Sequence, residues 1–231
     1  MNTSVIIVCA GNSTRMGGVN KILLPLGERL VIGVTMQAFQ QCESVREIII
    51  VARECDIPQI RTEAEAAGIT KLKECAIGGN TRQESVINGV RRISPDTELI
   101  AVHDGARPLV RPEHIERTIR DAQVFGGAAL GVPVKDTIKM VEDGLITDTP
   151  PRKLLYITQT PQIFKRRLYF EGIDFASEHD LDFTDDCQLV EAIGGKIAMT
   201  TGDYTNIKIT TPEDIRLAEV LMKMRTDITK L

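Results

Sequence analysis

The sequence predicts an α/β fold with a mostly parallel central sheet, formed by one domain over residues 1–231, from which a β-arm projects. Short apolar runs alternate along the chain with segments whose apolar residues recur every three or four positions, as in buried strands and amphipathic helices. The connections are long enough for right-handed crossovers, which place successive strands parallel. A chain of 231 residues is also long enough to bury a full core.

The first half of the chain is expected to supply most of the parallel sheet. Its expected strands are Ser4–Ala10, Glu47–Ala52, Lys71–Ala76 and Glu98–His103. Its expected helices are Leu30–Gln41, Ile57–Ala67 and Thr81–Ile93. Because such sheets bind ligands at the carboxyl ends of their strands, we look for functional residues in the loops after Ala10, Ala76 and His103.

A hairpin arm is expected over residues 133–156. Strand-like stretches at Ala128–Val134 and Thr137–Val141 precede the turn sequence EDG, and the returning strand runs into Pro150–Pro151. Two helices and two strands are expected to follow, at Arg166–Glu178, Asp185–Ile193, Lys196–Thr200 and Asn206–Ile209. The last helix is expected to begin at Thr211, because a proline and two acidic residues follow in its first turn.

The composition narrows the class of protein. Hydrophobic residues make up 42% of the chain and charged residues 26%, with a net charge of −4. This balance argues against nucleic-acid binding, which usually needs a basic surface, but a local cluster of cations can still bind a small anion. No apolar run approaches the length of a membrane span, and no signal segment opens the sequence. The five cysteines are scattered without a C-x-x-C pair, so reduced thiols and a cytoplasmic location are expected.

The loop AGNSTRMGGVNK follows the first expected strand. It matches neither the G-x-G-x-x-G pattern of dinucleotide-binding folds nor the G-x-x-x-x-G-K-[ST] pattern of phosphate loops. Its small residues from Gly11 to Thr14 would still let backbone amides approach an anion, while Arg15 offers a planar fork and Lys21 a mobile charge to phosphate oxygens. The ordinary alternative is a glycine turn with two solvated cations.

Two later loops add polar groups at strand ends. In IGGNTRQESV, Asn80 and Ser85 follow a glycine pair and are candidate ligand contacts. The same segment can also be a plain joint between strand and helix, with Asn80 or Thr81 as the helix cap. In VHDGARPLV, Asp104 can pair with Arg107 or face a metal ion or a polyol hydroxyl.

Lys208 lies between two isoleucines, where burial of a lysine would cost free energy unless its ammonium reaches water or an anion. Alternatively, the lysine protects the edge of a sheet. With Arg15, Lys21 and Arg107 it forms a set of cations that fits a polyphosphate and a second phosphate. The sequence shows no pattern for an activated serine, a cysteine–histidine pair or a paired-histidine metal site. The chemistry expected is positioning and charge neutralisation, as in phosphoryl-type transfer.

Several motifs, taken in order, resemble the 2-C-methyl-D-erythritol 4-phosphate cytidylyltransferase family of the non-mevalonate isoprenoid pathway. They are AGNSTRMG, GGNTRQESV, VHDGARPLV, PVKDT, TPPR, QTPQIF, FTDD and NIKITTPEDI, and they extend from about Val5 to Ala218. The resemblance implies a Rossmann-like nucleotidyltransferase fold of the glycosyltransferase-A type and a homodimer joined by the β-arm. It also implies Mg²⁺-dependent transfer of CMP from CTP to a polyol phosphate, 2-C-methyl-D-erythritol 4-phosphate, with release of pyrophosphate.

The resemblance also implies roles for individual residues. Arg15 and Lys21 match the catalytic cations that stabilise the transition state. The residues implied to bind the nucleotide are Ala10, Gly11, Ser13, Gly79, Asn80, Ser85 and Lys208. Those implied to bind the polyol phosphate are Asp104, Arg107, Thr137, Arg152 and Thr184, with Thr137 and Arg152 reaching from the arm into the partner's site. Asp104 is the candidate Mg²⁺ ligand, and the CTP phosphates are expected to hold most of the ion's coordination.

Four positions depart from the residues usual in the family. Asn20 and Ile22 flank Lys21 where proline and glutamine are common, Asn80 stands for an acid, and Gly105 for an alanine. Two alternatives remain: a ribitol-5-phosphate cytidylyltransferase, which shares most motifs, and a non-catalytic nucleotide-sensing protein on the same fold. Retention of the family's cations argues against the second. An NAD-dependent dehydrogenase is excluded, because neither G-x-G-x-x-G nor an acid ending the second strand is present.

Overall fold

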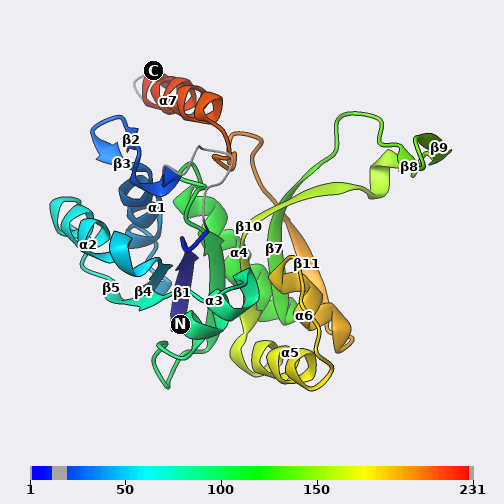
Figure 1. The fold of residues 1–231 in the computed structure, drawn as a ribbon, viewed down its shortest axis with the longest axis horizontal. Coiled ribbons are helices and arrows are strands. Elements are labelled where there is room, and N and C mark those ends of the chain that lie inside the picture. Colours follow the sequence, from blue (N-terminus) through cyan, green and yellow to red (C-terminus); the bar gives the residue numbers. More distant parts are fainter. Residues whose placement is uncertain (1, 12–19, 229–231) are drawn as a thin grey trace.

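The computed structural model describes residues 2–11 and 20–228, and a seven-stranded sheet forms the centre of this part of the chain (Figure 1). The strand order is β11-β7-β10-β6-β1-β4-β5. The strands are β1 (Thr3–Val8), β4 (Val45–Ala52), β5 (Leu72–Ile77), β6 (Leu99–Asp104), β7 (Gly127–Pro133), β10 (Tyr156–Lys165) and β11 (Ile197–Thr201). All neighbouring pairs are parallel except those of β10, which runs antiparallel to β6 and β7. The mostly parallel sheet that the apolar pattern predicted is therefore confirmed.

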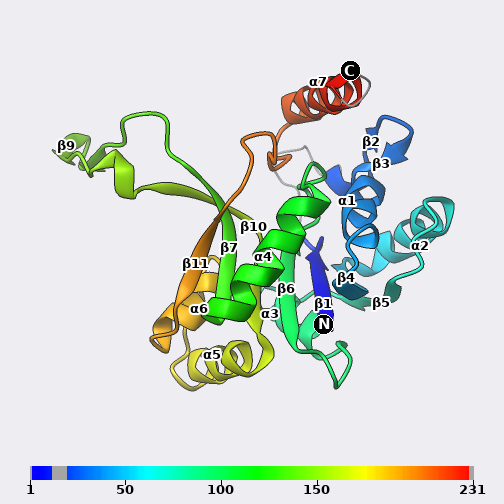
Figure 2. The same ribbon diagram turned by 180° about the vertical axis from the view of Figure 1, so that it is seen from behind.

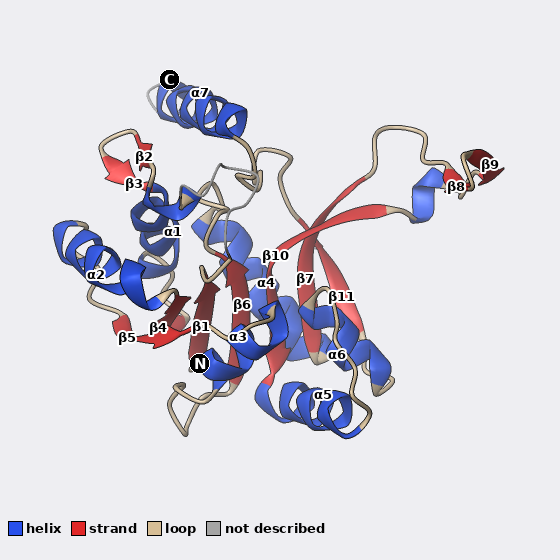
Figure 3. Cartoon of the chain, viewed as in Figure 1, coloured by secondary structure: helices blue, strands red, loops and turns tan. Residues whose placement is uncertain are grey.

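Helices cover both faces of the sheet, as Figure 3 shows by colour and Figure 2 shows from behind. One face carries α1 (Val31–Gln40), α2 (Ile57–Ala66) and α4 (Pro112–Phe125), and the other carries α3 (Arg82–Val90), α5 (Arg166–Glu178) and α6 (Asp186–Ala192). Successive side chains of β1 point to opposite faces, so Ile7 packs with the first group and Ile6 with the second. Burial on both faces explains why the strand is continuously apolar.

The last helix and a small hairpin lie together at one end of the molecule. Helix α7 (Pro212–Ile228) begins directly after Thr211, as predicted. The hairpin consists of β2 (Pro25–Leu26) and β3 (Arg29–Leu30), and α7 contacts β2. Among the described residues, the structure contains no helix with the length and apolar character needed to cross a bilayer.

Helix α4 and strand β10 are the two longest elements that were not expected from the sequence. In α4, only Ile115, Ile119 and Ala122 give a buried apolar stripe, because charged and polar residues occupy most of the other positions. Strand β10 contains Pro161, at a point where its pairing with β7 is irregular. A proline argues against a central strand when only the sequence is read.

The strand expected at Asn206–Ile209 is wrong. These residues form a loop held by tertiary contacts: the amide of Ile209 donates to the carbonyl of Ala106 (2.8 Å), and the side chain of Asn206 donates to the carbonyl of Thr160 (3.1 Å). The apolar pattern of NIKI reflects this burial and not a β-ladder.

The β-arm is present and leaves the body between the end of β7 and the start of β10 (Figure 1). Its hairpin pairs β8 (Met140–Glu142) with β9 (Leu145–Asp148). The first arm strand was expected at Thr137–Val141 but begins later, because the tight turn at Asp143–Gly144, where both residues have positive φ, fixes a short ladder that ends at Met140. Many large apolar side chains of the arm are exposed, namely Ile138, Met140, Val141, Leu145, Ile146, Leu154, Tyr156 and Ile157.

Candidate functional site

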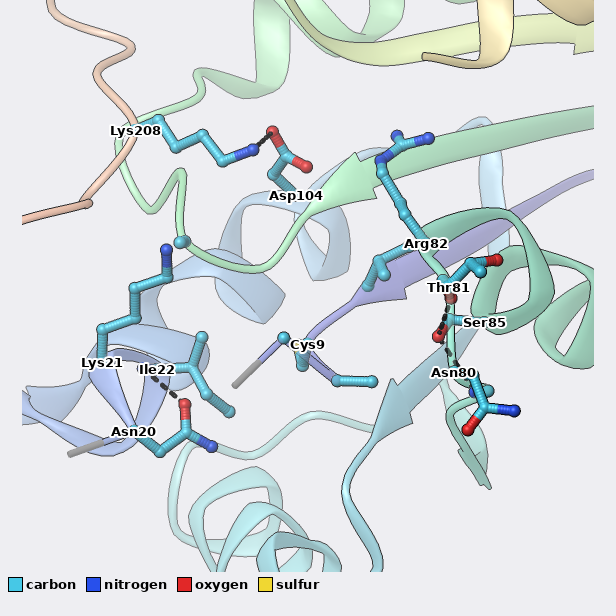
Figure 4. Close-up of a pocket in the computed structure, with 15 residues that line it drawn as sticks. Cys9, Asn20, Lys21, Ile22, Asn80, Thr81, Arg82, Ser85, Asp104 and Lys208 are labelled. Atoms are coloured by element: carbon cyan, nitrogen blue, oxygen red, sulfur yellow. Dashed lines mark hydrogen bonds and ion pairs between the residues drawn. The ribbon is translucent and has the colours of Figure 1, made fainter. Parts of the chain in front are cut away.

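A cavity of about 500 Å³ opens where β1, β5 and β6 end (Figure 4). The described residues that line it are Val8, Cys9, Ala10, Gly11, Asn20, Lys21, Ile22, Gly79, Asn80, Thr81, Arg82, Ser85, Asp104, Ala106 and Lys208. The carboxyl ends of parallel strands were expected to hold the site, and this volume is typical of small-molecule sites.

The loops after β1 and β5 pack closely because Gly78 has no side chain. A Cβ at this position would lie 2.2 Å from the Cβ of Ala10. The amide of Gly78 also donates to the carbonyl of Ala52 at the end of β4 (2.9 Å). These contacts bring the Gly79–Asn80 loop to the same cavity as Ala10 and Gly11.

The start of α3 forms one wall of the cavity and is stabilised by its own polar side chains. Thr81 is the N-cap and accepts from the amide of Glu84 (3.0 Å). The hydroxyl of Ser85 donates to the carbonyl of Thr81 (2.9 Å) and accepts from the amide of Gly79 (3.0 Å). The Glu84 carboxylate accepts from the amide of Asn80 (2.7 Å). The capping alternative is thus confirmed for Thr81, in a segment that also lines the cavity.

Asp104, at the end of β6, carries two ion pairs. Its Oδ2 atom lies 3.2 Å from Nε of Arg107 and 2.9 Å from Nζ of Lys208. Burial alone would raise the pKa of Asp104, but the charges of Lys208 and Arg107 hold it well below its usual range. Asp104 is therefore ionised, and its expected pairing with Arg107 is confirmed.

The loop that carries Lys208 is fixed next to this carboxylate. Arg107 donates from Nη1 to the carbonyl of Asn206 (2.9 Å), and Figure 4 shows the Lys208 ammonium directed at the carboxylate of Asp104. A lysine in this otherwise apolar stretch is explained by that contact.

Arg82 is a cavity residue that the sequence analysis did not select. It is the first residue of α3, and its Nη2 donates to Oδ2 of Asp186 (2.6 Å). Tyr169 donates its hydroxyl to the other oxygen of the same carboxylate. Burial lowers the pKa of Arg82, but the charge of Asp186 raises it by more. The net pKa lies above its usual range, so the guanidinium stays charged. Its only sequence signal is its place in the GGNTRQESV motif.

Lys21 lines the cavity from a short 3₁₀ helix at Lys21–Leu23. In Figure 4 its side chain extends from this turn toward the loop that follows β6. The neighbouring Asn20 and Ile22, which depart from the family's usual residues, are both buried. All three residues line the cavity, and Lys21 supplies the charge of the triplet.

The structure brings most of the expected site residues together, but not all. Those that line the cavity are Ala10, Gly11, Lys21, Gly79, Asn80, Ser85, Asp104 and Lys208. Arg107 pairs with Asp104 but does not itself line the cavity. Thr184, which precedes α6, donates its hydroxyl to the side chain of Gln188 (2.9 Å) and does not line the cavity either. Thr137 and Arg152 lie on the arm, where Arg152 donates to the carbonyl of Lys135 (2.6 Å). Ser13 and Arg15 lie outside the described residues.

Asp104 is the only acidic side chain among the described residues that line the cavity. Within residues 2–11 and 20–228 there is no group of three or more His, Cys, Asp or Glu residues that could hold a metal ion. Both ion pairs of Asp104 use Oδ2, and its carboxylate is ionised. One carboxylate fits a magnesium ion that arrives with nucleotide phosphates, because Mg²⁺ commonly takes one or two carboxylates together with phosphate oxygens and water.

The fold and this set of groups define a nucleotidyltransferase site. Glycine loops at the ends of parallel strands surround one carboxylate, and three cationic side chains among the described lining residues, Lys21, Arg82 and Lys208, supply positive charge. Such an arrangement binds polyphosphate and stabilises charge that develops on it.

Comparison with known proteins identifies the family within this class. Residues 3–224 match the family model of IspD, 2-C-methyl-D-erythritol 4-phosphate cytidylyltransferase. The chain is 42% identical over 226 residues to the protein of that name from Caldanaerobacter subterraneus, covering 96% of this chain and 100% of the relative. It is also 42% identical to that from Syntrophotalea carbinolica, over 96% of this chain and 97% of the relative.

Solved structures agree with the sequence comparison. The 4-diphosphocytidyl-2C-methyl-D-erythritol synthase of Anaerococcus prevotii superposes with a TM-score of 0.86 at 30% identity, covering 96% of each chain. The 2-C-methyl-D-erythritol 4-phosphate cytidylyltransferase of Thermus thermophilus gives a TM-score of 0.78 at 32% identity, covering 96% of this chain and 100% of the other. The chain belongs to the 2-C-methyl-D-erythritol 4-phosphate cytidylyltransferase family.

Proposed function

We propose that this cavity transfers CMP from CTP to 2-C-methyl-D-erythritol 4-phosphate, giving 4-diphosphocytidyl-2-C-methyl-D-erythritol and pyrophosphate in the synthesis of isoprenoid precursors. Membership of the family supports this activity. The observation that carries the assignment to this cavity is the convergence of Lys21 and Lys208 with the Gly79–Asn80 loop around one buried carboxylate, Asp104.

The reaction needs charge stabilisation more than it needs a protein nucleophile. A phosphate oxygen of the polyol phosphate attacks the α-phosphorus of CTP, and the bond from that phosphorus to the oxygen bridging the β-phosphorus breaks to release pyrophosphate. Lys21 donates to the non-bridging oxygens of the α-phosphate as negative charge builds on them. Arg15 is assigned the same role from its motif alone. Each such donor is worth roughly 2–4 kcal/mol of transition-state stabilisation.

The nucleotide is proposed to lie between the loops after β1 and β5. The amides of Gly79 and Asn80 already donate to the side chains of Ser85 and Glu84 at the start of α3. What this loop offers to a base is therefore its carbonyl oxygens and the Asn80 side chain, whose amide carries a donor and an acceptor for the edge of cytosine. The small residues Ala10, Gly11 and Ser13 are assigned to the triphosphate, and Ser85 shapes the loop that receives the nucleoside.

The polyol phosphate is proposed to bind on the side of Asp104, with Arg107 and Thr184 close to it. Lys208 lines the cavity beside this carboxylate, 2.9 Å from its Oδ2, and can neutralise phosphate charge. We propose Mg²⁺ as the metal, held by the CTP phosphates with Asp104 as the protein ligand. When bound, the ion neutralises phosphate charge and favours departure of pyrophosphate.

The arm is proposed to join two copies of the chain into a homodimer and to complete the partner's site with Thr137 and Arg152. None of the described residues that line the cavity comes from the arm of the same chain, and the arm exposes a row of large apolar side chains that a second copy would cover. Mixing Arg152→Ala and Lys21→Ala subunits tests this. Each variant is expected to be nearly inactive alone, and a statistical mixture should recover about a quarter of the wild-type activity, because half of the dimers contain one intact site. Mixed dimers without recovery would contradict the shared site.

The substrate is tested by pyrophosphate release from CTP and Mg²⁺ with either 2-C-methyl-D-erythritol 4-phosphate or ribitol 5-phosphate. Release with the first and not the second is expected. Release only with ribitol 5-phosphate would assign the enzyme to the alternative substrate while leaving the site in place.

Residues 1–231 are proposed to form one domain, because both halves of the chain contribute strands to one sheet. The five free cysteines fit a reducing compartment, and a cytoplasmic location is proposed on that ground.

A further inference from the structure

The turn that carries Lys21 is anchored on both sides by buried side chains. Asn20 is 7% exposed and Ile22 is 2% exposed. Ile22 belongs to the apolar cluster under α1, so it fixes the turn from the side of the core. The side chain of Asn20 is polar and also buried, and a buried polar side chain needs hydrogen-bond partners.

Asn20 finds its partner on a distant segment. Its Nδ2 donates to Oδ2 of Asp56 (2.6 Å), which lies in the connection between β4 and α2. Its Oδ1 accepts from the amide of Ile22 (3.4 Å), which closes the first turn of the 3₁₀ helix. The same side chain therefore caps the turn and ties it to the body of the protein.

Asp56 is itself held in place. It is 5% exposed, and Arg53 binds it with two bonds, from Nε to Oδ2 (2.6 Å) and from Nη2 to Oδ1 (3.0 Å). This two-point contact fixes the plane of the carboxylate, with Oδ2 also placed to accept from Asn20. Arg53 directly follows β4, and the clamp thus connects the central sheet to the turn that carries Lys21.

We propose that Asn20, Asp56 and Arg53 form a positioning clamp that sets the place of the Lys21 ammonium for catalysis. The proposal rests on the catalytic role assigned to Lys21 above. A lysine carries a compact charge on a long four-carbon stem, so the effect of Lys21 on the α-phosphate depends on where its backbone is held. Asn20 is among the residues that line the cavity, but its side-chain amide is engaged by Asp56 and Ile22, so the clamp acts on the transition state through Lys21. Loss of the clamp should then lower kcat more than it raises KM for CTP.

The test uses pyrophosphate release by the full-length enzyme at saturating 2-C-methyl-D-erythritol 4-phosphate. Asn20→Ala is expected to lower kcat roughly 10- to 100-fold, because displacement of a catalytic group by about 1 Å has effects of this size, while KM for CTP changes less than about threefold. Gln40→Ala is the matched control. Its side-chain amide also bridges two segments, through Thr70 and Lys71, but far from the cavity lining, and kcat should be unchanged.

Two further comparisons separate positioning from general damage to the fold. In a Lys21→Ala background, Asn20→Ala should change kcat less than about twofold, since the group that it positions is gone. Asn20→Asp places two carboxylates in contact and should lower kcat, and Asn20→Asp with Asp56→Asn restores one donor and one acceptor and should recover most of it. Melting temperatures of all variants are recorded alongside.

Three results would overturn the clamp: an unchanged kcat in folded Asn20→Ala, an equal loss in the Lys21→Ala background, or an exchanged pair no better than Asn20→Asp alone. A Lys21→Ala enzyme with wild-type kcat is a separate outcome. It would remove the role of Lys21 on which the clamp depends, and the two failures are therefore distinguishable.

Discussion

Position 105, between the cavity-lining residues Asp104 and Ala106, has no room for a side chain, so Gly105→Ala should lower the free energy of unfolding. A Cβ there would lie 2.3 Å from Sγ of Cys9 and 3.3 Å from Cγ2 of Ile7. The backbone cannot easily move away, because the amide of Gly105 donates to the carbonyl of Val8 (3.0 Å) and its carbonyl accepts from the hydroxyl of Thr35 (2.9 Å).

The size of the effect follows from the overlap. Ordinary contacts between heavy atoms lie at about 3.5–4.0 Å, so Cys9 and position 105 must separate by more than about 1 Å. Cys9 is 5% exposed and closely surrounded. Overpacking of this kind costs about 1–3 kcal/mol, which for a protein of this size lowers the melting temperature by about 2–12 °C.

The assay is urea unfolding of four proteins: wild type, Cys9→Ala, Gly105→Ala and the double variant. Cys9→Ala removes the sulfur that the new methyl group would meet, so the double variant should be more stable than the two single effects predict by about 1–2 kcal/mol. Single effects that simply add, within about 0.5 kcal/mol, would refute the proposed contact. A Gly105→Ala protein as stable as wild type would refute it directly.

Two pH effects follow from buried titratable groups. Burial would raise the pKa of Glu47, but hydrogen bonds from Ser4 and Ser94 lower it below its usual range. The stability that Glu47 contributes is therefore fully present above about pH 4.3 and is lost as the pH falls through the pKa of the folded state. The difference in unfolding free energy between wild type and Glu47→Gln should shrink on acidification, and a constant difference would contradict this. Burial lowers the pKa of His103 to about 4, so its neutral form supports stability fully above about pH 6.5 and less as the pH falls toward 4. NMR titration of its ring should give a midpoint near 4, and a midpoint near 6.5 would contradict the lowering of its pKa by burial.

The sequence predicts those parts of the fold whose local pattern agrees with their burial. β1, β4 and β6 are apolar on both faces and could be recognised as buried parallel strands. β10 could not, because buried Gln159, Thr160 and Gln162 interrupt its apolar pattern around a proline. These polar side chains are satisfied only by tertiary partners. Gln162, for instance, accepts from the amide of Asp186 (3.0 Å).

The candidate site was predictable where glycines and cations follow strand ends in the sequence. Lys21 and Asp104 were selected on that basis, and both line the cavity. Arg82 and Asn20 were not selected, because their importance depends on residues far along the chain. Arg82 bonds a carboxylate 104 residues away, and Asn20 bonds Asp56 across 36 residues. Only the folded chain brings these partners together.

The central claim is that Lys21 stabilises the transition state of cytidylyl transfer in this cavity, and a single-turnover experiment tests it most directly. Enzyme in excess over labelled CTP is mixed with saturating 2-C-methyl-D-erythritol 4-phosphate and Mg²⁺, and the rate of product formation is compared between wild type and Lys21→Ala. The expected rate falls by about 10²–10³, with the Kd for CTP changed only a few-fold. A rate equal to that of wild type would contradict the claim.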